Sequence, residues 1–289
     1  MKRTIHRAIA LVAMSLAAAQ PSYGEGCRKT LLQWSYGTSF EGGPDLDEPL
    51  VTDRPDFTES SVTVGYGVAQ LEMGYTYTYD SDGTGSVRSH SFPETLLRLG
   101  TLADWFELRL DWNYVEERTT ELGGPVDTAS GAEDLTIGCK IALTPQECIL
   151  PETAVVLQSG LPSGSSEFTA DELLPGALYL YSWEINDAWS TGGLSAVHRA
   201  KDEVTDDAYV LLHQSWTLVR SWTERVATFT EWYVLAPTSA DTDHTEHYFD
   251  GGFTVLLSDD IQWDVLAGVG LNDAADDFFV GTGLSIRFR

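Results

Sequence analysis

Apolar and polar residues alternate along much of this chain. In the stretch AQLEMGYTYTYD (69–80), an apolar or aromatic residue occupies every second position from Ala69 to Tyr79. Because successive side chains of a strand point to opposite faces, this pattern predicts a strand with one apolar and one polar face. The same period continues over residues 106–114, 135–143 and 261–270. These segments exceed the usual strand length, and they predict an all-β protein built from long strands.

The alternating segments and their connections predict the topology. About twelve strands are expected, at residues 68–79, 92–101, 104–116, 133–143, 153–160, 172–184, 189–198, 207–218, 222–235, 246–257, 260–270 and 278–288. Short turns alternate with long polar loops, which we place at residues 80–91, 117–132, 161–171, 199–206, 236–245 and 271–277. This rhythm is typical of a closed up-and-down antiparallel transmembrane β-barrel with short periplasmic turns and long acidic outer loops.

Aromatic residues at the strand ends favour a membrane location. Trp183 and Trp189 flank one short turn, and Trp216 and Trp222 flank another. Tyrosine and tryptophan collect where hydrocarbon meets water, so such belts are expected of a membrane barrel. We therefore expect the apolar face to point to lipid and the polar face to line the lumen, which reverses the arrangement of a soluble barrel with an aromatic core.

The first residues have the features of a secretory signal. Lys2, Arg3 and Arg7 precede an apolar run over residues 8–19, which ends in small residues. This run is shorter than the ~20 residues that a spanning helix needs, so we interpret residues 1–24 as a signal peptide rather than an anchor. Residues 25–67 are then a periplasmic extension, residues 68–289 form the barrel, and the expected location is the bacterial outer membrane.

One short stretch carries a resemblance to a known family. The segment VTDRPDFTES (51–60), followed by the spacing of Gln70, Glu72 and Gly74, resembles the outer-membrane family named "Putative MetA-pathway of phenol degradation". The resemblance implies a transporter-like outer-membrane β-barrel, and it assigns no functional residues. We expect a channel or uptake protein for small molecules, including hydrophobic or aromatic ones. A structural or adhesin-like barrel with a closed lumen is the alternative.

Two groups of residues are candidates for function. Strand parity points one group of charged residues into the lumen: Glu72, Glu94, Arg98, Glu107, Arg109, Asp111, Asp134, Lys140, Glu231 and Asp264. These charges predict either a network of ion pairs that stiffens the wall or a weakly cation-preferring pore. The second group is the DRPD motif, Asp53, Arg54, Pro55 and Asp56, which predicts a turn or plug at the barrel floor with a folding or a gating role.

The net charge of −27 argues against a nucleic-acid partner, because phosphates would be repelled. Outer-membrane lipid and a small solute are the expected partners. Divalent cations can also bridge the acidic loops, which are densest at residues 201–207 and 241–247. Neither loop has the glycine turn of a calcium hand, so a solvated surface is the simpler interpretation. No cofactor and no defined metal site are expected.

Enzymatic activity is not expected either. His213 and Ser215 are near one another in sequence, and a lipid hydrolase is the weaker alternative that they suggest. However, the sequence has no nucleophile motif of the GxSxG kind. The cysteines permit a disulfide between Cys27 and Cys148 in the oxidising periplasm, and Cys139 is expected to face lipid as a free thiol.

Overall fold

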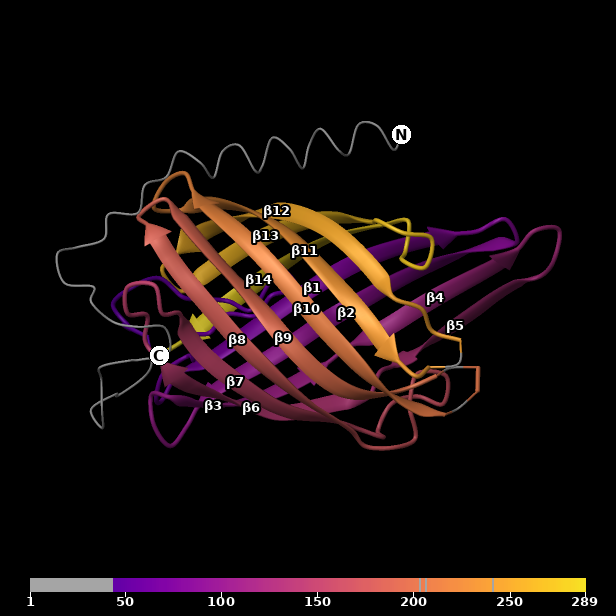
Figure 1. Ribbon diagram of the computed structural model, residues 1–289, viewed down its shortest axis with the longest axis horizontal. Coiled ribbons are helices and arrows are strands. Elements are labelled where there is room, and N and C mark those ends of the chain that lie inside the picture. Colours follow the sequence, from indigo (N-terminus) through magenta and orange to yellow (C-terminus); the bar gives the residue numbers. More distant parts are fainter. Residues whose placement is uncertain (1–43, 203, 206, 241) are drawn as a thin grey trace.

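The computed structural model describes residues 44–289 except 203, 206 and 241. Within these residues, fourteen β-strands form one antiparallel sheet (Figure 1). They are β1 (Ala69–Ser81), β2 (Gly85–Gly100), β3 (Phe106–Trp112), β4 (Tyr114–Glu121), β5 (Val126–Ala132), β6 (Leu135–Thr144), β7 (Glu152–Leu161), β8 (Leu174–Asn186), β9 (Trp189–Lys201), β10 (Ala208–Ser221), β11 (Val226–Thr238), β12 (Glu246–Ser258), β13 (Ile261–Gly270) and β14 (Phe278–Phe288). None of the described residues forms a helix that is long and apolar enough to cross a membrane.

The sheet closes on itself. Strand β1 pairs with β14 on one side and with β2 on the other, so the ring consists of β1, β2, β3 and β6 to β14. Each neighbouring pair is antiparallel, and a closed ring leaves no edge strand with unpaired backbone groups. The structure confirms the predicted twelve-stranded up-and-down barrel.

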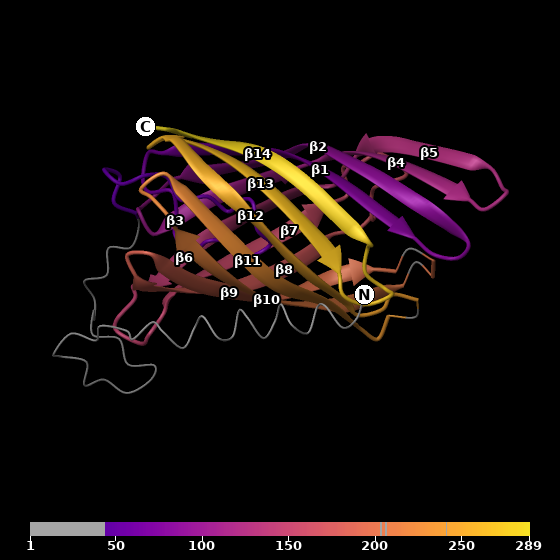
Figure 2. The ribbon, with the colours of Figure 1, turned by 90° about the horizontal axis from the view of Figure 1, so that it is seen from above.

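Strands β4 and β5 correct the predicted loop pattern. Residues 80–91 and 117–132 were expected to be loops, but β1 continues to Ser81, β2 begins at Gly85, and β4 pairs with both β2 and β5. These strands form a hairpin that projects beyond the ring, at the end away from the C-terminus (Figures 1 and 2). A strand with water on both faces needs no apolar row, so the hydrophobic period that revealed the other strands is missing here.

The wall of the barrel has the predicted two faces. On β3, Leu108 and Leu110 are exposed on the outside, whereas Glu107 and Arg109 are buried inside. Tryptophans on other strands are also exposed outward, among them Trp216, Trp232 and Trp263. An apolar outer surface that would be costly in water is favourable in hydrocarbon, and this explains the sustained alternation.

The interior of β7, β8 and β9 departs from the prediction of a polar inner row. Here the inward side chains form a buried apolar cluster, consisting of Ala154, Val156, Leu178, Leu180, Leu194 and Ala196. These strands are therefore apolar on both faces. The reason is tertiary, because Phe57 from the N-terminal segment packs against this cluster inside the barrel.

Candidate functional site: a strap across the lumen

Residues 50–64 cross the interior of the barrel, and we call this segment the strap. It contains the DRPD motif and forms no strand with the wall. Its polar groups instead contact inward side chains of β1, β2, β3, β6 and β11. The sequence predicted a plug or turn at the barrel floor, and the structure places the motif among the buried charges of the lumen.

Asp53 is the ionic centre of the strap. Its carboxylate lies 2.8 Å from Lys140 Nζ and 3.4 Å from Arg98 Nη1, and it also accepts a hydrogen bond from Arg109. The three cations come from β6, β2 and β3, and all are buried. Buried charges are tolerated only when they are paired, so these basic residues and the strap carboxylate depend on one another.

Wall carboxylates bind the backbone of the strap. Glu72 accepts the amides of Asp53 and Arg54, at 3.0 and 2.9 Å. In the same way, Glu231 accepts the amides of residues 57 and 58, at 2.6 and 2.8 Å, and Glu107 accepts the amide of residue 64 at 2.9 Å. These charge-assisted hydrogen bonds replace the partner strand that an extended segment otherwise requires.

Arg54 lies against glycines of the wall. Its Nη1 atom is 2.9 Å from Glu94, and its Nη2 atom is 3.4 Å from Asp264. A Cβ atom on Gly74 would lie 2.2 Å from Arg54 Nη1, and one on Gly283 would lie 2.3 Å from Arg54 Nε. The guanidinium therefore fits only because both wall positions lack a side chain.

The other half of the strap makes apolar contacts. Phe57 packs on the inner apolar cluster of β7 to β9 and stacks on Tyr233, with ring centroids 4.4 Å apart and an interplanar angle of 9°. Tyr233 stacks in turn on Tyr248, at 4.7 Å. The strap is thus held at one side by ion pairs and at the other by an apolar and aromatic wall.

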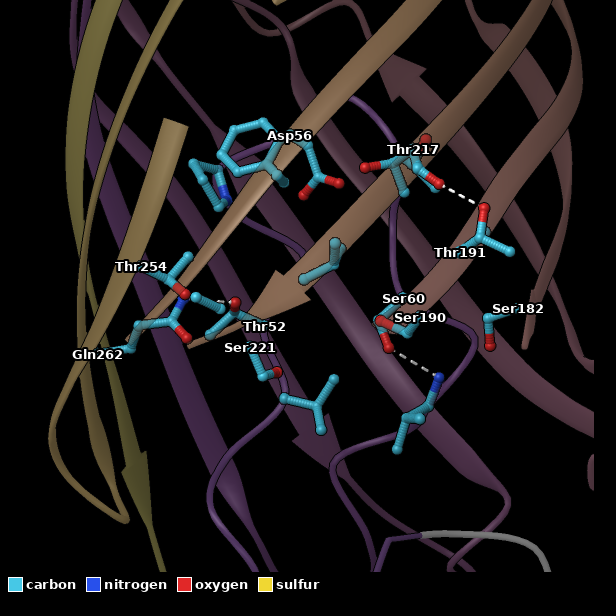
Figure 3. Close-up of a pocket in the computed structure, with 18 of the residues that line it drawn as sticks. Thr52, Asp56, Ser60, Ser182, Ser190, Thr191, Thr217, Ser221, Thr254 and Gln262 are labelled. Atoms are coloured by element: carbon cyan, nitrogen blue, oxygen red, sulfur yellow. Dashed lines mark hydrogen bonds between the residues drawn. The ribbon is translucent and has the colours of Figure 1, made fainter. Parts of the chain in front are cut away.

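Two cavities lie on opposite sides of the strap. The first, about 440 Å³, is at the short-turn end and is rich in hydroxyl groups from the strap and the wall, as Figure 3 shows. The second, about 490 Å³, lies toward the long-loop end, and we call it the outer cavity. Arg54, Pro55, Asp56 and Glu59 line both cavities. The DRPD motif is therefore the partition between them.

The lumen residues proposed from the sequence fall into three groups. Those buried around the strap are Glu72, Arg98, Glu107, Arg109, Lys140, Glu231 and Asp264, and Glu94 joins them through Arg54. Asp111 lines the outer cavity. Asp134 lies at the loop end, where it accepts the amides of Ser163, Gly164 and Ala170 and holds that loop.

Phe57, Thr58 and Tyr233 were not proposed from the sequence. Thr58 donates to Glu231 and also contacts Ser215, and the rings of Phe57 and Tyr233 stack inside the barrel. The only signal for them was their position directly after the DRPD motif or on the inward row of a strand. Neither feature shows that Phe57 and Tyr233 meet, because they are far apart in the sequence.

The remaining candidates show no catalytic arrangement. Ser215 contacts Thr58 and the amide of Leu194, whereas His213 stacks on His198 at 4.6 Å. Among the described residues, no group of three or more His, Cys, Asp or Glu side chains is placed to hold a metal ion. The weaker hydrolase interpretation thus gains no support from the geometry.

The cysteines and acidic loops are placed as follows. Cys139 is a free thiol and Cys148 is disulfide-bonded, while its predicted partner Cys27 lies outside the described residues. In the loop after β9, Asp202 accepts the amides of Thr205 and Thr242. Its carboxylate therefore connects two acidic loops, and cation binding by these loops stays a prediction.

A closed twelve-stranded barrel with an apolar outer surface and a charged interior defines a bacterial outer-membrane β-barrel protein. The sequence matches the model of the family described as "Putative MetA-pathway of phenol degradation" over residues 52–288. The chain therefore belongs to this family, and the resemblance carried by residues 51–60 is confirmed. The match includes nearly all of the strap as well as the barrel.

Solved structures share the fold. The COG4313 outer membrane channel from Pseudomonas putida F1 superimposes with a TM-score of 0.65 at 12% sequence identity, covering 81% of this chain and 99% of that one. The transport unit of the autotransporter AIDA-I from Escherichia coli gives a TM-score of 0.50 at 8% identity, covering 77% and 89%. No curated protein matches the sequence.

Proposed function

We propose that this protein is an outer-membrane channel for the passive passage of small molecules, and that the strap forms its constriction. The observation that carries the proposal is the pair of cavities, about 440 and 490 Å³, on opposite sides of residues 54–59 within a closed barrel. A barrel with a purely structural role would be expected to fill its interior with side chains. The Pseudomonas putida protein of the same fold is described as a channel.

The linings support solutes that are small and partly apolar. The rings of Phe57, Tyr233 and Phe279 border the outer cavity, and hydroxyl groups such as those of Thr217 and Thr254 border the cavity at the short turns. A molecule with an aromatic ring and a polar group can be accommodated by both surfaces in turn. The family description, which refers to phenol degradation, agrees with this class.

Substitution within the lumen tests the channel. Thr254 points into the cavity at the short turns, whereas the adjacent Phe253 contacts Trp263 on the lipid face. We expect Thr254→Trp to lower the single-channel conductance in planar bilayers, and Phe253→Trp to leave it unchanged. Equal conductance in all three proteins would place the current outside the lumen and overturn the proposal.

The closed barrel is the second candidate function, because the strap makes buried ion pairs with residues of several strands. A wild-type protein that folds, inserts and passes no current would favour this candidate. We would then measure a variant in which Asp53 is replaced by Asn. Current in the Asp53→Asn variant but not in the wild-type protein would identify a channel that the strap closes. The absence of current in both proteins would identify a structural barrel.

A further inference from the structure

The outer cavity is strongly acidic. Seven carboxylates and two guanidinium groups line it: Asp53, Asp56, Glu59, Glu72, Glu94, Asp111 and Asp250, with Arg54 and Arg109. Arg54 pairs with Glu94, Arg109 pairs with Asp53 and Glu59, and Arg98 behind the lining pairs with Glu72. Among the described residues, no cation forms an ion pair with the remaining carboxylates, those of Asp56, Asp111 and Asp250. A volume of about 490 Å³ is within the range that holds a small organic molecule.

Asp250 is the carboxylate that points to a ligand. The residue is only 3% exposed, and its Oδ1 atom has no hydrogen-bond partner among the described residues. No described lysine or arginine forms an ion pair with it. Its cross-strand neighbour is Glu231, whose carboxylate is occupied by the strap. A buried acceptor in this position is costly unless a cation or donor binds it.

Aromatic rings lie beside this carboxylate. Phe57, Tyr233 and Tyr248 form a stacked row, with centroid distances of 4.4 and 4.7 Å, and Phe279 meets Tyr248 edge to face at 6.1 Å. Phe57, Tyr233 and Phe279 border the same cavity as Asp250. Aromatic rings attract organic cations. Phe57 and Tyr248 cover the two faces of Tyr233, so a further ring packs against its edge, in the edge-to-face arrangement that aromatic pairs favour.

We propose that the outer cavity binds organic cations that carry an aromatic ring, with the positive group at Asp250 and the ring packed edge to face against Tyr233. This inference deepens the proposed channel function, because it names the class of solute that the lumen selects. Aromatic anions are disfavoured by the surrounding carboxylates. A bare metal ion fits less well, because no group of three metal-binding side chains is present among the described residues.

Matched probes test the proposal. Benzyltrimethylammonium has both the charge and the ring, tetramethylammonium has the charge alone, and benzenesulfonate has a ring with the opposite charge. We expect calorimetric titration of the full-length protein in detergent to give the lowest Kd for benzyltrimethylammonium. A Kd higher by about tenfold is expected for tetramethylammonium, because the ring contact is lost, and no measurable binding is expected for benzenesulfonate.

Variants locate the binding. We expect Asp250→Asn to raise the Kd of benzyltrimethylammonium about tenfold or more, and Asp127→Asn, on the projecting hairpin, to leave it unchanged. We expect Tyr233→Leu to abolish the difference between the two ammonium probes. Folding of Asp250→Asn is judged by its heat-modifiable gel mobility. If this variant does not fold, the difference in Kd between the two ammonium probes, measured in Tyr233→Leu, tests the proposal.

Equal binding of benzyltrimethylammonium and benzenesulfonate, absence of binding, or an unchanged Kd in the folded variants would overturn this inference. Potassium chloride conductance, measured separately in planar bilayers, tests the channel itself. Selective binding without current would therefore refute the channel function and support the binding site. Current without selective binding would support the channel function and refute the binding site.

Discussion

The ion pairs of the strap allow the effect of removing its central charge to be estimated. Replacing Asp53 with Asn keeps the shape of the side chain and removes its charge. In the native protein this carboxylate pairs with Lys140, Arg98 and Arg109, all of them buried. The substitution removes one carboxylate partner from each of these three buried cations.

The magnitude follows from the remaining pairs. Removing one partner of a buried ion pair costs about 3–5 kcal/mol. Arg98 keeps Glu72 and Glu107, and Arg109 keeps Glu59 and Glu107, so the lower value, about 3 kcal/mol, is the better estimate. This energy corresponds to a shift on the order of 100-fold in the equilibrium between docked and released strap.

Hydrogen exchange measures that equilibrium directly. Five strap amides, those of residues 53, 54, 57, 58 and 64, donate to wall carboxylates and should exchange only when the strap is released. We expect Asp53→Asn to accelerate their exchange on the order of 100-fold, as detected by mass spectrometry of peptides covering residues 50–64. The exchange of strand amides should change little.

Asp47 provides the matched control. It is an exposed carboxylate in the segment before the strap. We expect Asp47→Asn to leave exchange within residues 50–64 unchanged. Unchanged exchange in Asp53→Asn, or an equal acceleration in both variants, would show that the ion pairs do not hold the strap, and the argument for a docked constriction would fail.

Two further predictions concern the wall and the loops. Gly74→Val should displace the guanidinium of Arg54, because a Cβ there would lie 2.2 Å from Nη1, and should also accelerate strap exchange; Gly83→Val, where no atom lies within 4 Å of a Cβ, is the control. The Thr205 amide and the Thr242 hydroxyl and amide hold the pKa of Asp202 well below its usual range. A carboxyl group whose pKa is lowered by folding stabilises the folded state at any pH above its pKa in the unfolded chain, which is near 4. Protection of the Thr242 amide against hydrogen exchange should therefore be constant from about pH 8 to 5 and fall in stronger acid. Asp202→Asn should abolish this pH dependence, and persistent dependence in that variant would contradict the assignment.

The alternation of residues was sufficient to predict the barrel. Side chains of a strand point to opposite faces whatever the partner strand is, so the exposed row of Leu108 and Leu110 and the buried row of Glu107 and Arg109 follow from local geometry. Backbone hydrogen bonding in hydrocarbon then requires closure. The same reasoning failed for β4 and β5, because water on both faces removes the pattern.

Only the tertiary structure decided what the inward residues do. Parity shows that Glu72, Lys140 and Glu231 face the interior, but it cannot show that all three meet residues 53–58, which precede the first strand. Closure of the ring brings β1, β6 and β11 around one space, and the strap enters that space because it supplies the opposite charge and an aromatic ring. The apolar interior of β7 to β9 has the same cause, since its partner is Phe57 rather than a neighbour in sequence.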